Sequence, residues 1–292
     1  MIKLTLCTML AALAVSAIMP LAQAAEKEIK LVDKGKAYAA IYVVPEVMAA
    51  DKTLPGTATY AERQAETERQ RLRESVKDLA RYFEMMSGAR IEVLTSAPQA
   101  KDKRVPIFVG ALATQRFPGA LPEAPARQGF RVVVARQGVG LMGESDEATS
   151  YAIYEVLDRL GCRWYMPSEM GEVIPRRSTI SLPIMDFAGK PGTLLRQIWF
   201  VDEDFKRRNR MGGPWVYAQH ALEHYITKEQ REQNPEWRAI IGGKPSDLRL
   251  KWSHPGVQQA VADAIIRKLD ARYEPSISIS LWASALPKLL RD

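Results

Sequence analysis

Two groups of acidic residues in the second half of the chain could take part in breaking a glycosidic bond. That reaction uses two carboxyl groups, one that protonates the leaving oxygen and one that acts as nucleophile or base. Asp202, Glu203 and Asp204 are adjacent and follow a predicted strand, and Glu236 stands beside Trp237. Adjacent acids also suit the first turn of a helix, where the helix dipole favours negative charge, and we prefer that interpretation for the first group.

Arg196 and Trp237 could provide a binding surface for a sugar. The guanidinium of Arg196 can form paired hydrogen bonds to sugar hydroxyls or to a uronate carboxylate, or it can make a structural ion pair. The ring of Trp237 can stack on the face of a sugar, but the Glu236–Trp237 pair could equally mark a junction between a helix and a loop. Asn209 follows "KRR" and is interpreted as a loop cap rather than a sugar ligand.

The stretch "HALEH" at residues 220–224 contains two of the three histidines of the chain. It fits the H-x-x-E-H pattern, in which two histidines one helical turn apart bind zinc and the glutamate activates water. The flanking residues do not otherwise resemble such a peptidase, and a third ligand would have to come from elsewhere, Glu274 being the distant glutamate. We therefore predict no metal and no other cofactor, and keep a zinc metallopeptidase with His220 and His224 as a remote alternative.

Alternating strands and helices are predicted around these residues. Strand-like runs occupy residues 193–200, 214–220 and 276–281, and helical patterns occupy residues 227–233 and 255–273. Such alternation is typical of parallel α/β units. The sequence Lys190-Pro191-Gly192 predicts a hinge between the first half of the chain and these alternating strands and helices.

The first half predicts an α+β sandwich, a mixed sheet with helices packed on it. Leu72, Val76, Leu79, Phe83 and Met86 share one face of a helix that ends near residue 88, while residues 61–71 are polar almost all round and predict a solvent-exposed extension. A second helix follows a cap near residue 145, and its apolar face ends at residue 161. Strands are predicted at residues 39–44, 91–96, 107–110, 162–165 and 179–183, the last of them ending the domain, with a hairpin at 130–143.

Several blocks of the chain resemble known families. The stretch "YAIYEVLDRLGCRWYMPSEMGEVIP" at residues 151–175, preceded by "GLMGES", resembles the end of the small N-terminal domain of family 67 α-glucuronidases, which family 20 β-hexosaminidases share. As ordered blocks, residues 39–279 resemble exported bacterial proteins with domain of unknown function 4838. Those proteins continue into a barrel-like region with an arginine, a later histidine and a Pro-Glu-aromatic element, which match Arg196, His220 and residues 235–237.

The resemblance implies the start of a TIM-like (β/α) barrel, in which Arg196 binds sugar hydroxyls. A complete barrel takes about 250 residues, whereas 101 residues follow Pro191. We therefore expect a signal peptide at residues 1–24, an α+β domain at 25–187 and an incomplete barrel at 192–292, apparently truncated or frameshifted after Ser280. The predicted substrate-binding residues are Arg196, His220, Glu236 and Trp237, and the catalytic carboxylates are expected to be missing.

These expectations lead to two functional hypotheses. The first is an exported glycoside-hydrolase-like protein that acts on or binds polysaccharide fragments. The second is a non-catalytic carbohydrate-binding or scaffold fragment. In both, the expected partner is carbohydrate, in the periplasm or outside the cell.

Composition limits the other classes of function. The first residues combine Lys3, an apolar run and the small-x-small motif at residues 22–24, which predicts export without a membrane anchor. Export would leave Cys162 as the single mature cysteine, interpreted as a buried thiol. The net charge is +7, but basic residues are spread along the chain and mixed with acids, so nucleic acid is not an expected partner.

Overall fold

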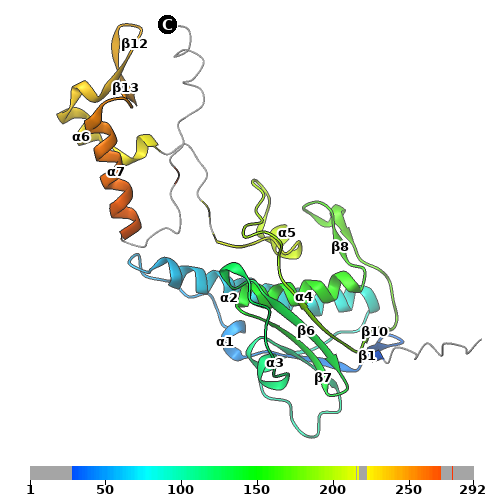
Figure 1. The fold of residues 1–292 in the computed structure, drawn as a ribbon. Helices are drawn as coiled ribbons and strands as arrows, with labels where there is room; N and C mark the ends of the chain where they lie inside the picture. The colour runs from blue at the N-terminus through cyan, green and yellow to red at the C-terminus, as the bar shows by residue number, and fades with distance from the viewer. Residues whose placement is uncertain (1–27, 215, 217–221, 271–277, 279–292) are drawn as a thin grey trace, which may run out of the picture.

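The computed structural model describes residues 28–214, 216, 222–270 and 278 (Figure 1). The predicted signal peptide lies outside the described residues. Residues 28–214 form a first unit around one main sheet, and residues 222–270 form a smaller second unit. None of the described helices combines the length and the apolar composition that crossing a membrane requires.

The main sheet of the first unit is mixed, which confirms the predicted α+β class. Its order is β11-β6-β7-β5-β3-β4, with β4, β3, β5 and β7 parallel and β6 and β11 antiparallel to their neighbours. The strands are β3 (Ala39–Tyr42), β4 (Val93–Leu94), β5 (Val105–Val109), β6 (Phe130–Ala135), β7 (Gly138–Gly143) and β11 (Met185–Gly189).

Helices cover both faces of this sheet. The long α2 (Tyr60–Ser87) and α4 (Asp146–Arg159) pack side by side on one face (Figure 1). The short α3 (Ala111–Arg116) covers the other face, above a smaller apolar cluster. Side chains alternate along a strand, so Ile41 joins the core under α2 and α4 while Tyr42 joins the cluster under α3.

The predicted helix face of α2 is confirmed, because its five apolar residues are all buried in the core. The helix begins at a capping box, in which Thr59 and Glu62 each bond the other's backbone N–H. It ends at Gly88, whose left-handed φ of 73° suits a glycine. The exposed polar extension predicted for residues 61–71 is wrong in part, because Glu66 and Arg69 are buried there against each other. The Arg69 guanidinium holds the pKa of Glu66 at about 2.

The aromatic residues that follow α4 form core. Trp164 lies edge-on to Tyr82 and Tyr154, with ring centroids 5.2 and 5.6 Å away, and its Nε1 donates to the Tyr82 hydroxyl at 2.8 Å. Cys162 is free and buried, and burial raises the pKa of its thiol to about 12. The predicted buried thiol is therefore confirmed.

Shorter elements complete the first unit. They are β1 (Glu28–Asp33), β2 (Lys36–Ala37) and β10 (Ile180–Pro183) in a small sheet, the hairpin of β8 (Arg163–Trp164) and β9 (Glu172–Val173), α1 (Pro45–Met48), η1 (Pro125–Arg127), η2 (Glu169–Gly171) and α5 (Glu203–Arg208).

Two strand predictions in this unit are wrong in part. The strand predicted at residues 179–183 is confirmed as β10, but the last strand of the unit is β11. The short sequence "MDFAG" has no run of β-branched residues, yet it pairs with the edge of β6 and is only half buried. The strand predicted at residues 193–200 is reduced to one bridge between Arg196 and Gly212, because Ile198, Trp199 and Phe200 stay exposed instead of alternating between core and solvent.

The second unit has its own small core. It contains η3 (Leu222–Tyr225), α6 (Lys228–Gln233), η4 (Pro235–Trp237), β12 (Arg238–Ile241), β13 (Lys244–Leu250) and α7 (Pro255–Asp270). Tyr225, Ile226, Leu250, Val257 and Val261 are buried together. The helices predicted at residues 227–233 and 255–273 are confirmed in position, α7 being described as far as Asp270.

The strands of the second unit differ from the parallel α/β expectation. β12 and β13 pair antiparallel through a turn at Gly242 and Gly243, which both have positive φ. Among residues 192–214 and 222–270, no strands pair in parallel. The strands predicted at 214–220 and 276–281 lie largely outside the described residues, so the incomplete barrel stays a prediction.

Candidate functional site

The short helix α5 is fixed to the first unit by buried charges. Arg207 and Arg208 each donate to Asp78 Oδ2 at 3.1 Å, and the Tyr154 hydroxyl donates to the same oxygen at 2.9 Å. Arg207 Nε also donates to the Tyr154 hydroxyl at 2.8 Å. Asp78 is 5% exposed, so α5 supplies the cations that this carboxylate of α2 requires.

A second carboxylate extends this network to the β8–β9 hairpin. Arg208 Nη1 and the Tyr82 hydroxyl each donate to Glu172 Oε1 at 2.9 Å. Burial raises the pKa of Tyr82, so its hydroxyl stays protonated and can donate. The network therefore holds α5 against α2, α4 and β9.

Arg196 fixes the segment that precedes α5. Its Nη2 donates to Gln128 Oε1 at 2.7 Å and to the Tyr151 hydroxyl at 2.8 Å. Its Nε and Nη1 donate to the carbonyl oxygens of Arg210 and Thr193 at 3.0 and 2.9 Å. The guanidinium also lies over the Tyr151 ring, with its carbon 5.3 Å from the ring centroid. Arg196 therefore links the backbone at Thr193 and Arg210 to the side chains of Gln128 and Tyr151.

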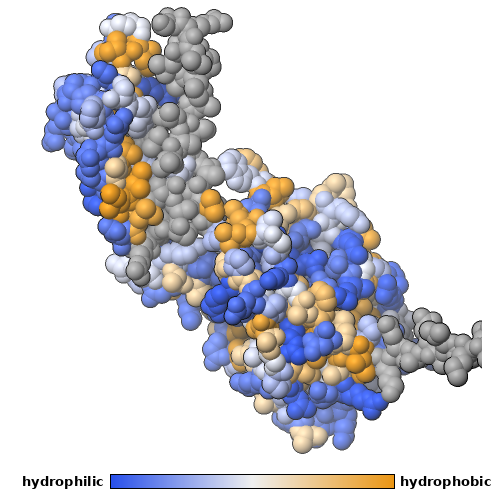
Figure 2. Space-filling view, viewed as in Figure 1, coloured by the Kyte–Doolittle hydropathy of each residue, from blue (hydrophilic) through white to orange (hydrophobic). Residues whose placement is uncertain are grey.

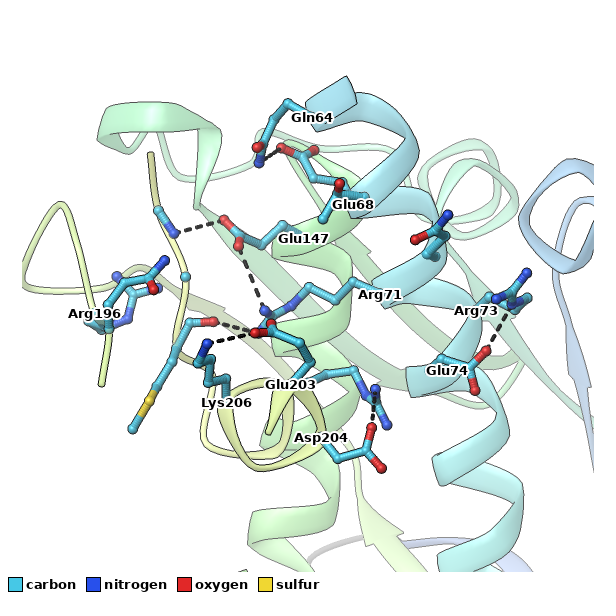
Figure 3. A pocket seen from close by; sticks show the side chains of 17 residues that line it. Gln64, Glu68, Arg71, Arg73, Glu74, Glu147, Arg196, Glu203, Asp204 and Lys206 are labelled. Carbon is cyan, nitrogen blue, oxygen red and sulfur yellow. Dashed lines mark hydrogen bonds and ion pairs between the residues drawn. The ribbon is translucent and has the colours of Figure 1, made fainter. Parts of the chain in front are cut away.

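A cavity of about 580 Å³ lies between α2, the first turn of α4 and the segment at residues 196–213 (Figure 3). Most of the side chains that line it are charged or amide groups. They come from Gln64, Thr67, Glu68, Gln70, Arg71, Arg73, Glu74, Glu147, Arg196, Gln197, Glu203, Asp204, Lys206, Arg207 and Met211, and the backbone of Gly212 and Gly213 completes the wall.

Two acids that line the cavity are Glu147, in the first turn of α4, and Glu68, on α2. Glu147 Oε2 accepts a hydrogen bond from the Gly213 N–H at 3.1 Å, and its Oε1 lies 3.8 Å from Arg71 Nη1. Glu68 accepts a hydrogen bond only from the Gln64 amide, at 3.0 Å, and makes no ion pair with any described residue. Burial raises the pKa of Glu68, as do the nearby carboxylates of Glu147 and Asp146.

Replacing Glu68 with glutamine should make the protein more stable at neutral pH than at acid pH, relative to the wild type. A carboxyl whose pKa is higher in the folded state binds more protons when folded, so wild-type stability falls as pH rises through that interval. Glutamine does not titrate and escapes this loss. Urea unfolding of both proteins below and well above the ordinary glutamate pKa of about 4.3 measures the difference. A difference that does not change with pH would contradict the assigned environment.

The structure places the predicted residues of the first unit on or beside this cavity. Arg196 lies on its wall, and Glu203 and Asp204 line it. Asp202 is the N-cap of α5, where its Oδ1 accepts the Phe205 N–H at 2.6 Å, which confirms the helix interpretation of the three acids. Asn209 is the residue that ends α5, as its interpretation as a loop cap predicted.

The remaining predicted residues do not line the cavity or are not described. Trp237 is half buried against the core of the second unit, and Glu236 is exposed in η4. His224 is exposed in η3, whereas His220 and Glu274 lie outside the described residues. Arg196 is thus not brought together with Glu236 and Trp237 in one described site, and the zinc motif remains a prediction.

Sequence reasoning missed the α2 side of the cavity. Gln64, Glu68 and Arg71 lie in the polar stretch that we assigned to solvent, and Glu147 was not singled out. The available signal was a polar extension of α2 that precedes its apolar stripe, which starts at Leu72.

Comparison with known proteins extends over part of the chain. The family model described as "Domain of unknown function (DUF4838)" matches residues 166–285. No curated protein matches this chain. The match begins in the β8–β9 hairpin and includes Arg196, α5 and the second unit, whereas α2 and α4 precede it. The cavity is therefore built by residues inside and outside the stretch that is similar to the domain of unknown function.

Proposed function

We propose that this chain binds carbohydrate, and that the cavity between α2, α4 and residues 196–213 is the binding site. The observation that supports it is the lining, in which carboxylate, amide and guanidinium groups surround about 580 Å³ of space. Sugar hydroxyls donate and accept hydrogen bonds at once, and a mixture of these planar groups can satisfy both functions. The signal sequence predicted at residues 1–24 and the resemblance to sugar-processing enzymes agree with this function.

Exposed aromatic residues beside the cavity support the same proposal. Trp199 is 66% exposed, and Phe200 is fully exposed and has a φ of 60°, which is unusual for a bulky side chain. They follow Gln197, which lines the cavity. Exposed rings next to a polar cavity could stack on the apolar faces of sugar rings.

Replacing Gln197 with alanine tests this function without disturbing the fold. Gln197 is exposed, so we expect unchanged stability and an oligosaccharide affinity lowered by about fivefold, as loss of one or two hydrogen bonds would give. The measurement is titration calorimetry of the full chain against oligosaccharides selected on a glycan array. Gln137→Ala, an exposed residue of the β6–β7 turn, is the control. Equal affinities of the wild type and Gln197→Ala would contradict the assignment of the site.

Hydrolysis of the bound sugar is a second candidate function. It is favoured by the presence of two carboxyl groups, Glu68 and Glu147, in one cavity, of which Glu68 has a raised pKa and could donate a proton. In this proposal residues 192–292 would be the first units of an incomplete (β/α) barrel. Release of new reducing ends during the binding experiments, abolished by Glu68→Gln, would support hydrolysis. Intact oligosaccharide after prolonged incubation would contradict hydrolysis and leave binding as the proposed function.

A further inference from the structure

The cations that line the cavity are already engaged by acceptors of the protein. Arg73 donates to Asp51 and Glu74, and Lys206 pairs with Glu203 at 2.6 Å. Arg71 donates to Ser150 and to the Met211 carbonyl. Arg207 pairs with Asp78 and Asp204, and four donor contacts of Arg196 go to protein oxygens. A uronate carboxylate would therefore have to share these cations with acceptors of the protein.

Most acids of the cavity are paired with these cations, but Glu68 is not. Glu68 makes no ion pair with a described residue, and its single hydrogen bond comes from the neutral amide of Gln64. The carboxylates of Glu147 and Asp146, at the start of α4, act electrostatically on Glu68, as does the cation of Arg127. Burial and these two carboxylates disfavour the ionised form of Glu68, which a cation of the ligand would stabilise.

We propose that the sugar bound in this cavity carries a free ammonium group, which pairs with the carboxylate of Glu68. The ligand class is an oligosaccharide of amino sugars that are not acetylated, rather than a uronic-acid or neutral oligosaccharide. The ammonium would occupy the space beside Gln64 and Glu68. The hydroxyls of the sugar would form hydrogen bonds with the side chains of Gln197 and Glu147. This inference rests on the proposed function and assigns its substrate class.

Three trisaccharides that differ in charge test this inference by titration calorimetry on the full chain. They are glucosamine trimer, its fully N-acetylated form and trigalacturonic acid. We expect glucosamine trimer to bind the wild type at least about tenfold more tightly than the other two, and Glu68→Gln to remove that preference. Glu84→Gln, the same change at an exposed position of α2, should leave the affinity unchanged.

The possible failures are distinguishable. Absence of binding by all three trisaccharides would contradict the proposed function itself. Tighter or equal binding of trigalacturonic acid or of the acetylated trimer would overturn the inference and leave carbohydrate binding intact. Preferential binding of glucosamine trimer that survives Glu68→Gln would also overturn it, because the ammonium would then pair with another group.

Discussion

Replacing Asp78 with alanine should lower the free energy of unfolding by about 3–5 kcal/mol, because it removes the buried carboxylate that two guanidinium groups share. Arg207 is 6% exposed, and both it and Arg208 donate to Asp78 Oδ2. The Tyr154 hydroxyl would lose the same acceptor. Urea unfolding of the full chain, followed by far-ultraviolet circular dichroism, measures the change.

Asp204→Asn provides the matched control for this change. Asp204 pairs with the same two arginines, but its side chain is 54% exposed. Ion pairs in contact with solvent contribute little, so the expected loss is below about 1 kcal/mol. If the two variants unfolded at the same urea concentration, burial of the Asp78 network would not be what holds α5 to the first unit.

Replacing Gly212 with alanine should abolish carbohydrate binding. A Cβ at this position would lie 2.1 Å from Glu147 Oε1 and 2.3 Å from the Tyr151 hydroxyl. Both are buried on α4, so the added methyl would push the 196–213 segment away from the cavity wall. The bridge between Arg196 and Gly212 would be lost with it, together with the closed side of the site.

Gly192→Ala is the control, because a Cβ at that position meets nothing within 4 Å. Affinity for the oligosaccharide, measured by calorimetry, should be unchanged in this variant and undetectable in Gly212→Ala. Thermal unfolding of both variants tests whether the first unit remains folded, and we expect the loss in Gly212→Ala to be about 1–3 kcal/mol. Full affinity in a folded Gly212→Ala protein would show that the segment does not form the site.

The local elements of the first unit could be predicted because their signals are local. The apolar spacing of α2, the cap near residue 145 at the start of α4 and the β6–β7 hairpin each depend on neighbouring residues, and all three are confirmed. The edge strand β11 could not be recognised in the same way. Its short, half-buried sequence becomes a strand only because β6 offers an unpaired edge.

The site was less predictable because its charges are satisfied over long separations in the sequence. Arg207 and Asp78 are 129 residues apart, and nothing near either residue indicates that they pair. The same pattern "KRR" would suit an exposed helix end equally well. The Gly242-Gly243 turn of the second unit is different, since two adjacent glycines are a known hairpin signal, which our prediction for the second half did not use.

The location of the bound sugar is the most direct test of the account. Backbone hydrogen exchange of the full chain, measured with and without a saturating oligosaccharide selected for binding, locates the site without a substitution. The account predicts slower exchange in residues 64–74 and 196–213 when the sugar is bound. Protection confined to residues 222–250, or no protection in the first unit at saturation, would contradict it.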